Sequence, residues 1–186
     1  MDLARTYGDF AEPASSDRNE GLTIVFSPSS MSLRERWKNN SLSADFMGDY
    51  FATFYTLEDT PESGRREEVK STVSFVANEL LENAMKFTDV DAVPITIRLT
   101  MQAGELVFFA SNGVSRPGAA RYEAAVQKLL SADLWAEYEQ RASAQGESSG
   151  IGLLSMLTDY SARIGWRFAP LDEQRILITT IVRIPL

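Results

Sequence analysis

The longest regular pattern of apolar positions in the sequence lies between residues 60 and 87. Apolar side chains recur there every three or four residues, at Val69, Val73, Val76, Leu80, Ala84 and Phe87. This spacing places side chains along one face of an α-helix, and Thr60 or Ser63 supplies a hydroxyl for its first turn. The pattern therefore predicts a long helix that ends near Phe87 and buries one face.

Runs rich in β-branched and aromatic residues predict strands. The clearest are residues 22–26, 94–101, 105–110, 166–168 and 176–184. The short link at 102–104 predicts an antiparallel hairpin, and the last two runs are expected to form another. Ser111-Asn112-Gly113 is typical of a turn, so we expect it to end the 105–110 strand.

Shorter patterns predict the remaining helices. Ser43 is expected to cap a helix that runs to about Thr56. Its apolar face is expected to hold Phe46, Tyr50, Phe54 and Leu57. Further helical stretches are predicted at 31–39, 122–130 and 134–141. A last helix is expected to follow Gly152, with one face formed by Leu153, Leu157, Tyr160 and Ile164.

Antiparallel hairpins with helices between them favour an α+β fold over a doubly wound parallel sheet. We expect a two-layer α/β sandwich with a mixed, mainly antiparallel sheet. Residues 1–20 are polar and are expected to form a flexible arm, and residues 21–186 a single domain. Within that domain, residues 22–59 are interpreted as an N-terminal extension and residues 114–147 as a helical, lid-like insert.

The composition narrows the chemistry. The 186 residues include no Cys, which excludes disulfides, thiolate zinc sites and cysteine nucleophiles. They include no His, so a general base must be Asp, Glu, Lys or Tyr. The net charge of −8 argues against a nucleic-acid partner. No apolar run is long enough for a bilayer and the N-terminus lacks a signal peptide, so we expect a cytoplasmic protein without a membrane partner.

Three polar residues on the predicted long helix are candidates for chemistry. Glu79, Asn83 and Lys86 lie within about 60° of one another around the helix axis, at the border of the apolar stripe. Glu79 offers a carboxylate that can take a proton, Asn83 an amide oxygen suited to Mg²⁺, and Lys86 a charge for a phosphate. The alternative is that these are ordinary polar residues on a solvated helix face. Taken alone, a Glu followed four residues later by an Asn is more often of this kind.

A second candidate is the segment from Ser148 to Leu153, which carries Gly150 and Gly152 where a helix is expected to begin. Helix starts have unpaired N–H groups that bind phosphates, and glycine lets the phosphate approach the backbone. The alternative is a simple loop and helix cap. Neither a P-loop nor a Rossmann glycine pattern is present.

Together the two segments resemble the GHKL superfamily of gyrase, Hsp90, histidine-kinase and MutL ATPases. Residues 78–88, Asn-Glu-Leu-Leu-Glu-Asn-Ala-Met-Lys-Phe-Thr, look like that family's N-box, and Gly150-Ile151-Gly152-Leu153 looks like its last glycine box. The resemblance runs from about residue 60 to the C-terminus. It implies the Bergerat fold, ATP as cofactor, Mg²⁺ held by Asn83, and Glu79 as general base. It further implies nucleotide contacts from Lys86, Ser111, Asn112, Gly113, Ser148, Ser149, Gly150, Ile151, Gly152 and Leu153.

Glu79 and the absence of His point to a hydroxyl acceptor on another protein. The sequence Ser148–Leu153 is similar to the serine-glycine turn of the anti-sigma serine kinases. The Ser111-Asn112-Gly113 turn, the helical insert through Tyr138 and the segment Gly150–Leu154 together resemble SiaB-like bacterial kinases. The resemblance therefore implies a serine/threonine kinase of a partner-switching pathway. Its expected partner is a small regulatory protein, STAS-like or SiaC-like.

One departure from the family pattern keeps a second interpretation open. GHKL proteins carry D-x-G-x-G after the central strand, and here Ser111 stands for the Asp that binds adenine and Ser115 for the second glycine. The loss of that hydrogen bond weakens base binding by about 1.5–3 kcal/mol. The alternative is a degenerate, non-catalytic module that binds a partner. Trp37, Phe46, Phe51 and Phe54 either form a homodimer interface or pack on the sheet.

Overall fold

Alternating apolar positions build the sheet on which the structure rests. The computed structural model describes residues 3–11, 20–27, 39–55, 64–89, 93–102, 104–131, 133, 136 and 151–186. In this part of the chain, four helices pack on one six-stranded sheet in a two-layer α/β arrangement. The expected α+β class is therefore confirmed. The described strands pair only in the antiparallel sense, so the expectation of a mixed sheet is wrong.

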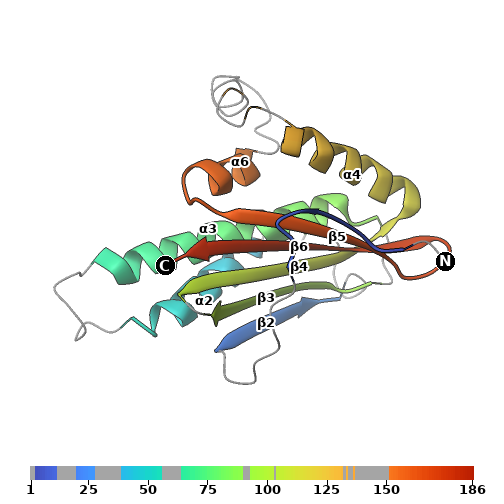
Figure 1. The fold of residues 1–186 in the computed structure, drawn as a ribbon. Coiled ribbons are helices and arrows are strands. Elements are labelled where there is room, and N and C mark those ends of the chain that lie inside the picture. The colour runs from blue at the N-terminus through green and yellow to red at the C-terminus, as the bar shows by residue number, and fades with distance from the viewer. Residues whose placement is uncertain are drawn as a thin grey trace.

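The two predicted hairpins form the middle of the sheet, and their second strands pair with each other (Figure 1). The strand order is β1-β5-β6-β4-β3-β2. The strands are β1 (Arg5–Gly8), β2 (Gly21–Phe26), β3 (Ile95–Gln102), β4 (Glu105–Ser115), β5 (Arg163–Pro170) and β6 (Arg175–Pro185). Gly104 adopts φ +81° in the link between β3 and β4, a left-handed conformation that favours glycine.

The predicted turn at Ser111–Gly113 lies inside a strand. β4 continues to Ser115, and each of these three residues pairs with β6, Asn112 with Ile178. Strand pairing overrides the turn propensity of Asn-Gly, because β6 is as long as β4 and offers pairing partners along its whole length. The side chains of this segment therefore alternate between the two faces of the sheet. We call the face covered by the helices the inner face and the opposite one the outer face.

Part of the expected flexible arm forms the edge strand β1. Arg5–Gly8 pairs with β5, and Tyr7 packs edge-on against Phe168 with ring centroids 5.8 Å apart. Arg5 donates to Glu123 at 2.8 Å, and the Tyr7 hydroxyl also donates to Glu123. For residues 5–8 the arm prediction is wrong, because these side chains find partners that are distant in sequence. Residues 12–19 lie outside the described part.

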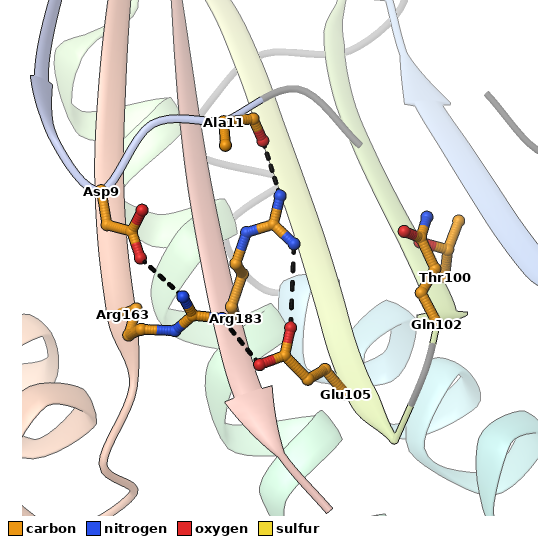
Figure 2. A network of polar contacts seen from close by, with 7 residues as sticks. All are labelled: Asp9, Ala11, Thr100, Gln102, Glu105, Arg163 and Arg183. Carbon is orange, nitrogen blue, oxygen red and sulfur yellow. Dashed lines mark hydrogen bonds and ion pairs between the residues drawn. The ribbon is translucent and has the colours of Figure 1, made fainter. Parts of the chain in front are cut away.

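Residues 9–11 cross the outer face after β1 (Figure 2). Arg163 donates to Asp9 at 3.0 Å and to Glu105 at 2.7 Å. Arg183 donates to the Ala11 carbonyl at 2.6 Å. A Cβ at Gly165 would lie 2.4 Å from the Phe10 nitrogen, so this glycine leaves room for the crossing chain.

The predicted long helix is α3 (Gly64–Phe87), and it packs against β3 and β4. Its apolar stripe is buried as expected at Val69, Val73, Val76, Leu80 and Ala84. Thr60 and Ser63, the expected caps, lie outside the described residues. The confirmed stripe decides which residues border the core, and Glu79 and Asn83 are both half-buried there.

The second predicted helix is α2 (Asn40–Ala52), but it buries another face than expected. Phe46 and Phe54 are 55% and 39% exposed, whereas Met47 and Phe51 are fully buried; Leu57 and Trp37 lie outside the described residues. A Cβ at Gly48 would lie 2.3 Å from Ser74 Oγ of α3, so the two helices approach closely along a face that holds small residues. Asn39 is the N-cap, and Ser43 instead lies in the first turn.

The other described helices are α4 (Arg116–Ser131) and α6 (Ile151–Thr158). α4 begins directly after β4, earlier than the helix predicted at 122–130. α6 stops at Thr158, so Ile164 belongs to β5 and not to the face expected for it. The helices predicted at 31–39 and 134–141 lie outside the described residues, apart from positions 39 and 136. None of the described helices is long and apolar enough to cross a membrane.

The burial of α2 against α3 is tested by a pair of matched substitutions. Phe51→Ala is expected to lower the free energy of unfolding by about 3–5 kcal/mol, because it opens a cavity in the core. Phe46→Ala, on the exposed face of the same helix, is expected to change it by less than about 0.5 kcal/mol. Urea unfolding of both variants measures the difference, and equal effects would contradict the described packing.

Candidate functional site

The first turn of α6 lies directly on α3, at the residue proposed as general base. A Cβ placed on Gly152 would lie 1.8 Å from Glu79 Oε2 and 2.8 Å from Glu79 Cγ. Further along, Tyr160 stacks on Phe75 of α3, with ring centroids 5.2 Å apart. The two contacts show that α6 runs back along α3. Two segments that are more than 70 residues apart therefore meet, and any larger residue at the meeting point would require the Glu79 side chain to shift.

The carboxylate of Glu79 is in an unusual electrostatic position. Burial raises its pKa above the ordinary value, and the nearby negative charge of Glu82 raises it further. Glu82 is held in place by Asn78, whose Nδ2 donates to it at 2.8 Å. A carboxylate with a raised pKa is a stronger proton acceptor, and such a shift beside a glycine-lined contact is typical of a functional site.

Asn83 and Lys86 follow Glu79 on α3 at the spacing that the sequence predicts. Asn83 is half-buried one turn after Glu79, and Lys86 is exposed, with its Nζ 6.0 Å from the centre of the Phe87 ring. In the described part of the chain, no group of three or more Asp, Glu, His or Cys side chains could hold a metal ion. A cation here would take the amide oxygen of Asn83 and complete its coordination with water or ligand oxygens, as Mg²⁺ commonly does.

Ser111, Asn112 and Gly113, which are expected to contact the nucleotide, lie on opposite faces of the sheet. Asn112 is buried on the inner face, where its Nδ2 donates to Thr88 Oγ1 at 3.2 Å. Thr88 in turn donates to the Ala84 carbonyl at the end of α3, at 2.6 Å. Ser111 and Gly113 are on the outer face, because both are adjacent to Asn112 and successive residues of a strand point to opposite faces of the sheet. A Cβ on Gly113 would lie 2.4 Å from the Val93 side chain.

Aromatic side chains fill the space between α3, α4 and the sheet. Phe87 stacks on Tyr122 with ring centroids 4.2 Å apart. Tyr122 is buried, and its hydroxyl lies 3.5 Å from Thr180 Oγ1 of β6. Burial raises the pKa of this hydroxyl. A planar ligand that entered between α3 and α4 would therefore have to displace or rearrange Tyr122.

The glycine segment is described only in part. Ser148, Ser149 and Gly150 lie outside the described residues. Ile151, Gly152 and Leu153 form the first turn of α6, so the helix begins before Gly152 and not after it as expected. Leu153 is partly buried against the core, so it anchors the turn and leaves the contact with Glu79 to Gly152.

Asp89 and Ser115 join the end of α3 to the start of α4, and sequence reasoning did not single them out for this role. The Asp89 carboxylate accepts hydrogen bonds from the Ser115 amide and hydroxyl. The Ser115 hydroxyl accepts one from the Gly118 amide at 3.1 Å, which makes Ser115 the cap of α4. Ser115 followed by Pro117 is a signal for a helix start. The partnership with Asp89 has no local signal.

A depression of about 910 Å³ lies away from these residues, around the first turns of α3. Its lining includes Arg65, Glu68, Thr72 and Tyr160. Thr72 is seven residues before Glu79, about 10 Å along the helix axis. Size alone would favour the depression as the binding site. We prefer the Glu79–Gly152 contact because it combines a perturbed carboxylate with a position where glycine permits close approach.

No protein-family model matches this chain, and no curated protein matches it. The GHKL resemblance therefore stays a prediction, carried by the residues named above and by where they lie.

The contact between Glu79 and Gly152 is tested by a double-mutant cycle. Alanine is the better helix former, so Gly152→Ala is expected to stabilise the protein in a Glu79→Ala background, where the added methyl has room. In the presence of Glu79 the same change is expected to be less favourable by at least about 0.5 kcal/mol, since contacting residues couple. Urea unfolding of the four proteins measures this coupling, and strictly additive effects would contradict the contact.

The raised pKa of Glu79 predicts a pH-dependent stability. Between the ordinary pKa of a glutamate and the raised one, the unfolded chain releases the proton first, so stability falls as the pH rises through this window. Glu79→Gln keeps the shape without the charge. It is expected to be more stable than the wild type at pH 7 and equally stable below about pH 4, where the unperturbed carboxyl is protonated. A difference that is constant across this range would contradict the shift.

Proposed function

We propose that this chain is an ATP- and Mg²⁺-dependent protein serine/threonine kinase of the GHKL type, with the Bergerat fold. It phosphorylates a hydroxyl of a small partner protein in a bacterial partner-switching pathway. The observation that carries the proposal is the meeting of Glu79 with Gly152 at the start of α6. The GHKL resemblance requires these two residues at one site, and they come from segments that nothing local in the sequence would bring together.

The chemistry follows from the residues around this contact. The first turn of α6 binds phosphate through its unpaired N–H groups, and Lys86 adds a positive charge. The amide oxygen of Asn83 would hold Mg²⁺, which would neutralise phosphate charge. As the acceptor oxygen bonds to the γ-phosphorus, Glu79 takes the hydroxyl proton and the bond to ADP breaks. The raised pKa of Glu79 suits this role, because a general base works best with a pKa near the working pH.

At the end of the proposed site that recognises the nucleotide base, Asn112 takes the role that was expected of Ser111. Asn112 faces the helices, whereas Ser111 faces away from them. An amide offers both a donor and an acceptor to a base, but without a carboxylate's charge. We therefore propose that base recognition is weaker than in a protein with Asp at this position.

A second candidate function is a non-catalytic module that binds a partner. The Phe87–Tyr122 stack favours it, because these rings occupy the room between α3 and α4. In this case the Glu79–Gly152 contact is structural and no nucleotide binds. The exposed Phe46 and Phe54 are compatible with a homodimer in either case, and that expectation stays a prediction.

The kinase proposal is tested with labelled ATP, Mg²⁺ and the protein encoded by a neighbouring gene. Label is expected on a serine or threonine of the partner. Glu79→Gln is expected to slow the transfer by about 10²–10⁴-fold, the usual contribution of a general base. Asn83→Ala is expected to abolish the Mg²⁺-dependent part of nucleotide binding in calorimetry.

The matched control is Asn78→Ala, one turn before Glu82 on the same helix, which is expected to keep transfer within a few-fold of the wild type. Nucleotide binding without transfer to any candidate partner would contradict the kinase. Failure of the wild type to bind ATP or ADP would leave the partner-binding module.

A further inference from the structure

The Glu79 carboxylate lies where the proposed function needs a phosphate. It packs against the first turn of α6 at Gly152, and the phosphates are proposed to bind at the same turn. Glu79 makes no hydrogen bond or ion pair with a described residue, and its described charged neighbour Glu82 has the same sign. The carboxylate thus lies against the first turn of α6 without a hydrogen bond or ion pair to a described residue that would fix it there.

We propose that Glu79 is an internal competitor of the phosphate groups, so that it lowers nucleotide affinity as well as serving as the general base. This inference rests on the proposed function. The Glu79 carboxylate already occupies the position where a Cβ of Gly152 would lie, so a phosphate at this turn would meet a second negative group there. Nucleotide binding therefore requires the Glu79 side chain to turn away from α6.

The same displacement prepares the Glu79 carboxylate to act as the general base. At Gly152 the carboxylate faces the backbone of α6, where it has no hydroxyl to deprotonate. When phosphates take the place beside Gly152, the carboxylate turns away from the α6 backbone. No hydrogen bond or ion pair with a described residue has to break for this movement, and the competition is expected to change affinity by roughly tenfold, equivalent to 1.4 kcal/mol.

Calorimetry with ADP and with adenosine separates this effect from others. Glu79→Ala removes both charge and volume and is expected to bind ADP roughly tenfold more tightly than the wild type. Glu79→Gln removes only the charge and is expected to give an intermediate affinity. Adenosine has no phosphate, so its affinity is expected to be the same in all three proteins. Circular dichroism establishes that each variant is folded.

Glu82→Gln is the matched control, because it removes a neighbouring charge that does not contact Gly152. It is expected to tighten ADP binding less than Glu79→Gln does. Unchanged or weaker ADP binding by Glu79→Ala would overturn the inference and leave the proposed function standing. An equal gain for adenosine, or an equal gain in Glu82→Gln, would also overturn it. If neither the wild type nor any variant binds ADP, the proposed function itself fails.

Discussion

The burial of the α3 stripe against β3 and β4 is the interaction on which the rest of the structure depends. Val73, Val76 and Leu80 are completely or almost completely buried there, and their positions fix the rotation of the helix about its axis. With this rotation, Glu79 and Asn83 lie at the edge of the core, neither in water nor in the interior. With the same rotation, Ser74 faces Gly48 of α2, on the side of α3 that lies away from Glu79.

The approach of α6 to α3 turns this edge into a candidate site. Any side chain at Gly152 would collide with Glu79, so the position trades helix propensity for close contact. Glu79 in turn carries a burial penalty that a neutral residue would avoid. Such local costs are typical of functional sites, where stability is given up for chemistry. The combination is the main physical argument that this contact is more than packing.

Much of the fold was predictable because its signals are local. The spacing of Val69 to Ala84 predicted α3, and the runs around residues 95–110 and 166–184 predicted both hairpins. The failures have physical reasons that lie outside any local window. Asn112 and Gly113 remain in a strand because β6 pairs with them, and β1 forms because Tyr7 and Arg5 find partners on Phe168 and Glu123. The prediction of the buried face of α2 was wrong because it followed Phe46, Tyr50 and Phe54, whereas the face that packs on α3 combines Met47 and Phe51 with small residues such as Gly48.

For the candidate site, helical spacing predicted the neighbouring positions of Glu79 and Asn83, but the sequence did not predict the contact with Gly152. Glu79 and Asn83 lie side by side because helical spacing requires it, whereas the contact with Gly152 depends on the whole chain between them. The orientation of Asn112 and the Phe87–Tyr122 stack could not be foreseen either, since strand register and aromatic packing are tertiary properties.

The account's central claim, that the Glu79–Gly152 contact is a ligand site, is tested most directly by NMR. Amide resonances of ¹⁵N-labelled protein would be followed while ADP and Mg²⁺ are added. We predict that the largest shifts occur at residues 78–86 of α3 and at Ile151, Gly152 and Leu153. Shifts confined to the depression around Arg65 and Tyr160, or no shifts at all, would contradict the claim.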